Sequence, residues 1–159
     1  MQTYQVGLIA LGLAAIGIFF AYFSWKKARS NQEKSLNEPH WIETENSSGV
    51  EGFYVATTFA GEPLNRVSAY GLGARGRVGI SLETEGLELH RVGERSFQIS
   101  WASIKGLDTN SAVIDRAVER DGLVSVSWTL GQSVLETHLR IVNGEARKNL
   151  LNELSEKVL

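Results

Sequence analysis

The sequence predicts an N-terminal transmembrane α-helix followed by a mainly-β domain, in which about seven antiparallel strands form a barrel or sandwich that a C-terminal α-helix caps. The first observation is a run without charged side chains at residues 6–25. The second is the alternation of apolar and polar residues in short runs between glycine turns, and the third is a change to helical spacing after Asn143. We therefore divide the chain into an anchor (1–25), a basic flank and polar tether (26–48), and a β domain with its helix (49–159).

The apolar run, VGLIALGLAAIGIFFAYFSW, is long enough to cross a bilayer. At about 1.5 Å per residue its helix spans roughly 30 Å, the thickness of the hydrocarbon core. A cleaved signal peptide is the alternative, but it would have a basic segment, a shorter apolar run and small residues at its cleavage site. Here no Lys or Arg precedes the run, which ends in the bulky segment AYFSW. We therefore predict an uncleaved, single-pass anchor.

Basic residues determine the predicted orientation of the anchor. Lys26, Lys27 and Arg29 follow the run directly, and Lys and Arg beside a membrane span stay on the cytoplasmic side. This places the N-terminus outside and the domain in the cytoplasm, at the inner (plasma) membrane. The absence of cysteine fits a cytoplasmic domain. Aromatic residues suited to the two membrane interfaces flank the run: Tyr4, Tyr22, Phe23 and Trp25.

Small residues form a stripe along one face of the predicted anchor. Such a stripe lets a second helix approach closely, and this packing drives helix association in lipid. We predict a helical partner, from a second copy or from another protein. The alternative is that Gly and Ala are simply common in membrane helices, since Gly12 and Ala15 lie off the stripe. A helix lying flat on the membrane has no support, because no polar face exists. The members of the stripe are Gly7, Ala10, Ala14, Gly17 and Ala21.

The segment after the anchor is polar. Residues 30–48 contain Pro39 and show no sustained period, which predicts a tether that is either flexible or lies on the domain. Trp41 and Ile42 are apolar exceptions that could dock the tether on the domain or at the headgroups. From residue 49 onward the chain has 12 Lys plus Arg and 14 Asp plus Glu. A domain this close to neutral argues against general nucleic-acid binding.

Short alternating runs predict the strands of the domain. The second and third predicted strands form a hairpin, and the last two form another over Gly131 and Gln132, a turn with the expected glycine. The predicted strands are residues 53–58, 77–82, 87–91, 96–100, 113–117, 123–130 and 133–141.

Helical spacing follows Asn143, a suitable N-cap residue. Glu145 in the first turn and Lys157 in the last turn both favour the helix dipole. A helix with one apolar face can close the open end of a small barrel or sandwich. The apolar residues that share this face are Ala146, Leu150, Leu151, Leu154 and Val158.

The order and length of these elements resemble the pleckstrin-homology (PH) superfold. More narrowly, residues 52–91, GFYVATTFAGEPLNRVSAYGLGARGRVGISLETEGLELHR, resemble a family of actinobacterial membrane-anchored PH-like proteins. The segment FQI at 97–99 with Ile104, and RDGLVSVSWTL at 120–130, stand where that family has its middle and late strands. The resemblance covers most of residues 50–142 and the plan of one N-terminal span. It implies a fold and a membrane setting, and it implies no catalytic residues.

A glycine-rich segment offers a possible cofactor motif. Residues 71–76, GLGARG, match G-x-G-x-x-G. Dinucleotide binding by this motif requires a strand before it and a helix after it, whose N-terminus holds the pyrophosphate. Residues 77–82 are instead a predicted strand. We interpret the segment as a loop between strands and predict no cofactor.

Three arginines near this loop are candidate anion- or lipid-binding residues: Arg66, Arg75 and Arg77. PH-like domains of the phosphoinositide-binding type resemble this chain in placing basic residues in the loop after the first strand. Arginine can bind phosphate through two hydrogen bonds, and the basic flank would hold the domain near an anionic leaflet. Solvated charges at strand edges are the alternative, since Glu62 is nearby and no compact Lys-x-Arg pair exists.

No pattern indicates catalysis or metal binding. His40, His90 and His138 have no partner residues at a metal-ligating spacing, and no thiolate is available. Charged residues between 115 and 121 alternate in sign, which is typical of a solvated loop: Asp115, Arg116, Glu119, Arg120 and Asp121. Several aromatic residues are predicted to lie in the core or on a sheet face: Phe53, Phe59, Phe97, Trp101 and Trp128.

These observations predict a non-enzymatic docking or scaffold module. The expected role is that of an accessory subunit in a larger membrane assembly, such as a respiratory or transport complex. Its predicted partners are the bilayer and a transmembrane protein, without nucleic acid or metal. The alternative is a sensor of anionic lipid headgroups that uses the three arginines. An open strand edge could also accept a peptide, as in the PTB branch of the PH superfold.

Overall fold

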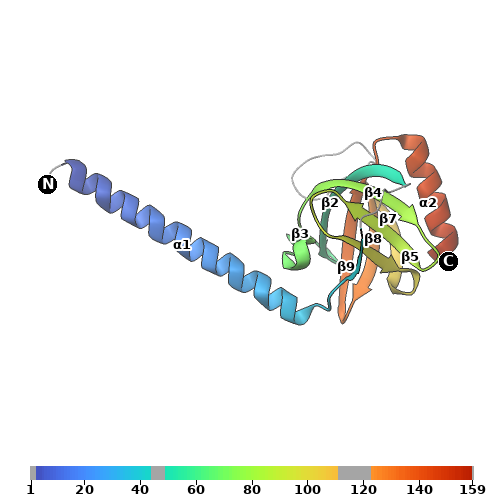
Figure 1. The fold of residues 1–159 in the computed structure, drawn as a ribbon, viewed down its shortest axis with the longest axis horizontal. Helices are drawn as coiled ribbons and strands as arrows, with labels where there is room; N and C mark the ends of the chain where they lie inside the picture. Colours follow the sequence, from blue (N-terminus) through green and yellow to red (C-terminus); the bar gives the residue numbers. More distant parts are fainter. Residues whose placement is uncertain (1–2, 44–48, 111–122, 159) are drawn as a thin grey trace.

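The computed structural model describes residues 3–43, 49–110 and 123–158. Its longest element, α1 (Thr3–Ser35), projects from a domain of strands as a single rod with the N-terminus at its far end (Figure 1). The helix thus continues past the predicted end of the anchor. From Gly7 onward it is long and apolar enough to cross a membrane, by length and composition. Every residue from 7 to 24 is exposed.

Within the described residues, nine strands form an antiparallel sheet in the order β1-β6-β5-β4-β2-β9-β8-β7, and β3 pairs with β2 outside this order. The long strand β2 pairs with β4 up to Tyr54 and with β9 up to Phe59, and a bulge between Tyr54 and Ala56 bends the sheet there. The strands are β1 (His40–Ile42), β2 (Val50–Phe59), β3 (Glu62–Arg66), β4 (Gly76–Leu82), β5 (Gly86–Arg91), β6 (Ser96–Ser100), β7 (Ile104–Asn110), β8 (Leu123–Leu130) and β9 (Ser133–Arg140).

The predicted fold class is confirmed, with more strands than expected. Both predicted hairpins are present, as β4–β5 and β8–β9. Three strands were not predicted: β1 lies in the polar tether, β3 contains Pro63, and β7 contains Gly106. Pro63 and Gly106 weaken the alternating strand pattern, because proline and glycine are unfavourable inside strands. The predicted strand at 113–117 and the charged cluster at 115–121 lie outside the described residues.

The core lies between the two halves of the bent sheet, with large side chains fully buried. Phe97 stacks on Trp128 with ring centroids 6.0 Å apart, and Tyr54 meets Phe97 edge-to-face at 6.2 Å. Of the aromatic residues predicted to be in the core or on a sheet face, Phe97 and Trp128 are buried, while 43% of Phe53 is exposed. Phe59 and Trp101 are partly buried against the core.

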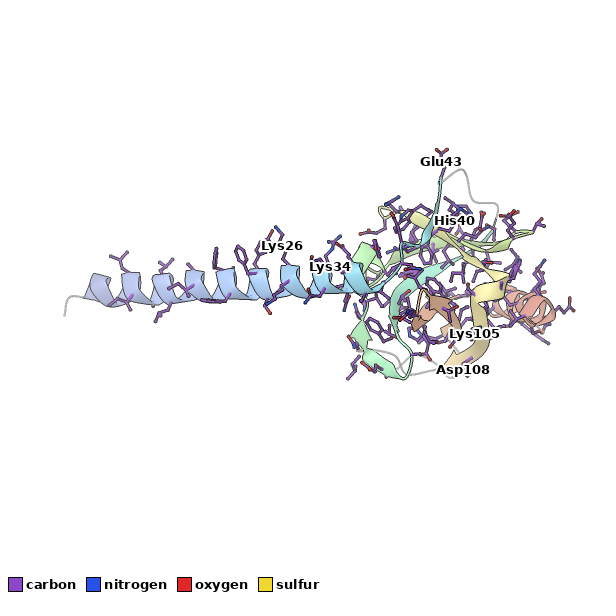
Figure 2. All side chains as sticks on the ribbon, turned by 90° about the horizontal axis from the view of Figure 1, so that it is seen from below. Lys26, Lys34, His40, Glu43, Lys105 and Asp108 are labelled. Carbon is purple, nitrogen blue, oxygen red and sulfur yellow. The ribbon has the colours of Figure 1, made fainter. Side chains whose placement is uncertain are left out.

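Helix α2 (Gly144–Val158) closes the core on the side of the domain away from α1 (Figures 1 and 2). Asn143 Oδ1 accepts hydrogen bonds from Glu145 N and Ala146 N, both at 3.0 Å, so the predicted N-cap is confirmed. Leu150 and Leu154 are buried, and each such side chain stabilises the fold by about 1.5–3 kcal/mol.

The chain between α1 and β2 lies on the domain as far as it is described. Leu36 is buried in the core and only 3% exposed. His40 pairs with Gln98 and Ile42 with Ser96, so that β1 extends the sheet beside β6. Trp41 packs edge-to-face on Phe97 at 6.4 Å. Residues 44–48 of the predicted tether lie outside the described residues.

Candidate functional site

The end of α1 is docked on the loop between β3 and β4, and one glutamine makes most of the polar contact. Gln32 Oε1 accepts hydrogen bonds from Ser68 N (2.7 Å), Ser68 Oγ (2.9 Å) and Ala69 N (3.2 Å). Three donors at one oxygen hold the loop closely against the helix. We call this contact, between residues 29–36 and residues 66–74, the joint.

Tyr70 fixes the joint from the domain side. Its hydroxyl lies 3.1 Å from Glu33 O and 3.2 Å from Leu36 O, and carbonyls at a helix end need such external donors. Its φ of 56° lies in the left-handed region, which costs a non-glycine residue about 1–3 kcal/mol. Burial, and then the Glu38 and Glu33 carboxylates, raise the pKa of Tyr70, so the hydroxyl stays a donor at neutral pH. The backbone strain at Tyr70 thus lies at the point where the domain positions the end of α1.

A cleft of about 620 Å³ opens at the joint. One wall is α1, where Arg29, Gln32 and Glu33 follow the i, i+3, i+4 spacing of one helix face. Figure 2 shows Lys26 and Lys34 projecting from the stretch of α1 that leads to the domain. The lining residues are Arg29 and Glu33 from α1, and Trp41, Arg66, Ser68, Tyr70, Gly71, Gly73, Ala74, Glu94 and Arg95 from the domain.

The cleft carries an excess of positive charge, with three arginines against two glutamates. Arg29 Nε lies 2.9 Å from Glu33 Oε1. The Arg95 guanidinium stacks 3.9 Å from the centre of the Trp41 ring. Arg66 is half-buried, and within the part of the chain that the structure describes its guanidinium has no ion-pair or hydrogen-bond partner. Such a cleft suits an anion, because guanidinium groups bind phosphate and carboxylate through paired hydrogen bonds.

A buried arginine holds the domain wall of the cleft. Arg91 is 3% exposed, and its Nη2 donates to Gly71 O and Ala74 O, both at 2.9 Å. Its guanidinium lies 4.2 Å from the centre of the Tyr54 ring. Burial raises the pKa of Tyr54 to about 12, although the charge of Arg91 acts in the opposite direction. The Tyr54 hydroxyl also lies 2.8 Å from Leu72 O, so the loop is tied to the core at three carbonyls.

The structure does not gather the three arginines predicted for anion binding. Arg66 lines the cleft. Arg77 lines a separate groove of about 640 Å³ with His90 and Phe53, while Arg75 is exposed and is part of neither lining. Their assignment to anion binding stays a prediction, with Arg66 in the more suitable setting.

The other predicted site residues lie along α1. In the basic flank, Lys26 and Lys27 are exposed, and Arg29 belongs to the cleft. A Cβ added at Gly7 or Gly17 would meet no atom within 4 Å, so the small-residue face is open. The remaining members of the stripe are also exposed: Ala10, Ala14 and Ala21.

The histidines have separate polar neighbours. His138 is buried between Thr58 Oγ1 (3.0 Å) and Ser125 Oγ (2.8 Å), and desolvation lowers its pKa to about 4. His90 uses the same nitrogen, Nε2, towards Ser81 Oγ (3.0 Å) and Glu88 Oε2 (3.2 Å). A nucleophile–histidine–acid relay needs one partner at each ring nitrogen, so these two contacts of His90 do not form such a relay. Across residues 3–43, 49–110 and 123–158, no group of three or more His, Asp or Glu side chains could hold a metal ion.

Sequence reasoning missed most residues of the joint. Gln32 is an ordinary polar residue in a polar segment, and its contact with Ser68 links positions 36 residues apart. Nothing in the composition indicates that Tyr70 has a positive φ or that Arg91 points inward. Trp41 was a partial signal, as an aromatic residue in a polar tether, and it packs against Tyr70 with ring centroids 6.2 Å apart.

Comparison with known proteins bears on the domain and the joint. Residues 33–155 match the model of a family described as Bacterial PH domain-like. The match begins at the end of α1 and includes the domain loop of the joint. No curated protein and no solved structure matches the chain.

Proposed function

Because the chain belongs to the bacterial PH domain-like family, we propose that it is a membrane-anchored docking module. PH-like domains serve as binding or docking modules and are generally non-enzymatic. In this proposal α1 crosses the plasma membrane once with its N-terminus outside, and the domain works in the cytoplasm as an accessory subunit of a larger membrane assembly. The narrower resemblance to actinobacterial single-span proteins belongs to the same proposal.

One observation carries it: an exposed apolar helix is continuous with a helix end that is fixed to a folded domain. Large apolar side chains along α1 are exposed, for example 71% of Leu11 and 69% of Phe20. Burying such surface in lipid or against protein is strongly favourable. The joint would then hold the domain close to the membrane in one orientation, which suits a module that presents a surface to a neighbouring membrane protein.

The open small-residue face supports contact with a partner helix. Leucine at Gly7, Ala14 and Gly17 would keep the anchor apolar and fill this face, so partners should be lost when the protein is purified in mild detergent and identified by mass spectrometry. The matched control places leucine at Gly12 and Ala15, off the stripe, and should retain the partners. Equal recovery from both variants would reject helix packing on this face.

The cleft supports a second candidate function, recognition of an anionic lipid headgroup. Its excess positive charge lies at the joint, and Arg29 follows residue 25 by about 6 Å of helix. Native mass spectrometry of the full chain in mixed micelles should show retention of phosphatidic acid over phosphatidylcholine. We expect Arg66→Gln to reduce this retention and Arg75→Gln, outside the cleft, to leave it unchanged. The same loss in both variants would indicate general charge attraction and reject the cleft as the site.

A further inference from the structure

The cleft is built across the joint, with one wall on α1 and the other on the domain. We propose that this cleft makes the joint ligand-gated: an anion bearing a phosphate group binds between the two walls and holds α1 on the domain. Conversely, release of α1 from the domain weakens binding of the anion. This inference rests on the second candidate function, anion binding in the cleft, and adds how that binding is regulated.

The α1 wall of the cleft and Gln32, which docks the helix end on the domain, belong to one helical turn. Arg29 and Glu33 line the cleft, and Gln32 between them accepts the hydrogen bonds from Ser68 and Ala69. The i, i+3 and i+4 positions of a helix move together as one rigid face. A displacement that breaks the Gln32 contacts therefore also withdraws Arg29 from the opposite wall.

The domain wall is tied to the same contact. Ser68 and Tyr70 both line the cleft. Ser68 bonds to α1 through Gln32 Oε1, and Tyr70 bonds to the carbonyl of Glu33 in α1 and to that of Leu36 just after it. Tyr70 holds a strained backbone conformation while it makes these bonds. Displacement of the helix end would remove the hydrogen bond from Tyr70 to Glu33 O, which helps to compensate this strain, so the domain wall has a physical reason to change shape.

The charges explain why a bound anion would strengthen the joint. Arg29 lies on the helix, whereas Arg66 and Arg95 lie on the domain. Glu33 balances Arg29 on the α1 wall, and the domain wall has two arginines against Glu94. A phosphate group between the walls would accept hydrogen bonds from Arg29 on one side and from the domain arginines on the other, and so would add an attraction that joins the two walls. The Arg29–Glu33 ion pair does not prevent this, because both side chains are substantially exposed, at 42% and 37%, and exposed pairs hold weakly.

Undocking does not require the domain to unfold. Leu36 is buried in the core and β1 pairs with β6, so the chain remains attached after the helix end. The movable part is the end of α1 from Arg29 to Glu33, which holds the acceptor of Ser68 and Ala69 and one of the two carbonyls that Tyr70 contacts. Docking of α1 and binding of the anion are two coupled equilibria, and such coupling is reciprocal. The factor by which the anion strengthens docking equals the factor by which docking strengthens binding of the anion.

The test measures both sides of this coupling in the full chain. The protein lacks cysteine, so Lys27→Cys and Lys148→Cys, both at exposed positions, give unique sites for two spin labels. Double electron–electron resonance then measures the distribution of distances between the label on α1 and the label on α2. The labelled protein is placed in phosphatidylcholine nanodiscs, in nanodiscs that also contain phosphatidic acid, and in phosphatidylcholine nanodiscs with inorganic phosphate. The three samples distinguish a lipid headgroup from a free phosphate.

We expect the anion to narrow the distance distribution and Gln32→Ala to broaden it. Gln32→Ala should also weaken binding of the same anion by about five-fold or more, the lower range of measured couplings. The matched control Asn31→Ala lies on the exposed part of the same turn and should change neither quantity. Arg66→Gln should abolish the narrowing while leaving the distribution without anion unchanged.

The outcomes separate this inference from the function on which it rests. Anion binding that depends on Arg66 but is unaffected by Gln32→Ala would overturn the gated joint and keep the cleft as a site. Absence of binding in all samples, or binding that does not depend on Arg66, would overturn both. A distribution that stays equally narrow in Gln32→Ala would show that α1 is held by other contacts, and this too would overturn the gated joint.

Discussion

The side-chain oxygen of Gln32 lies 2.7 Å from the backbone nitrogen of Ser68, and through this contact the last turn of α1 is held on the loop before β4. The same oxygen also accepts from Ser68 Oγ and Ala69 N. A helix joined to a domain only by a flexible linker would leave the position of the domain undefined. Here Gln32 defines it together with the hydroxyl of Tyr70 and the buried Leu36.

Replacing Gln32 with alanine should destabilise the joint. The substitution leaves two backbone N–H groups and a hydroxyl without their acceptor, and unsatisfied, partly buried groups cost about 1–3 kcal/mol. Hydrogen exchange of the Ser68 and Ala69 amides, followed by mass spectrometry in nanodiscs, should accelerate accordingly. Asn31→Ala is the control. Unchanged exchange in Gln32→Ala would mean that the contact contributes no stability.

Tyr70→Phe should weaken the joint without changing the backbone at this position. The ring, and with it the contact with Trp41, is retained, but the hydroxyl no longer donates to the carbonyls of Glu33 and Leu36. We expect a loss of about 1 kcal/mol in the free energy of unfolding, measured by urea titration. Tyr70→Gly should relieve the positive φ while losing the hydroxyl and the ring, so a more stable glycine variant would contradict the role given to this side chain.

The sequence was sufficient for the elements with strong periodicity. The pattern of β8 and β9 around Gly131, and the spacing from Ala146 to Val158, correctly predict a hairpin and a helix, because burial on one face imposes these periods. The strand β1 has only three residues, and its pairing with β6 depends on the docking of Leu36 and Trp41. Such tertiary contacts leave little trace in local sequence.

The candidate site was less predictable for the same reason. A basic residue in the loop is visible in the sequence, and Arg66 does line the cleft. However, the other two arginines of the cleft come from distant segments, α1 and the turn after β5. Arg91 looks like an alternating strand residue, and only the structure shows its guanidinium against Tyr54. Contacts between distant segments decide which charges meet.

Arg91→Met should be strongly destabilising. Methionine fills part of the same volume but leaves the carbonyls of Gly71 and Ala74 without a donor, and charged hydrogen bonds contribute about 1.5–3 kcal/mol each. We expect the free energy of unfolding to fall by about 2–4 kcal/mol in urea titration. Arg140→Met, at an exposed arginine, should change it by less than about 0.5 kcal/mol. Similar values for the two variants would contradict the role of Arg91 in holding the loop.

His138 should make the domain sensitive to acid. Its folded-state pKa is lowered from 6.5 to about 4, because its ring is buried between Thr58 and Ser125. The unfolded chain therefore takes up a proton first as the pH falls, so stability is fully present above about pH 6.5 and decreases towards pH 4. The loss at this site amounts to about 3 kcal/mol. Melting temperatures measured across this range should fall more steeply for the natural chain than for His138→Gln, which cannot titrate. Since other groups titrate equally in both proteins, parallel curves would show that His138 has no such depressed pKa.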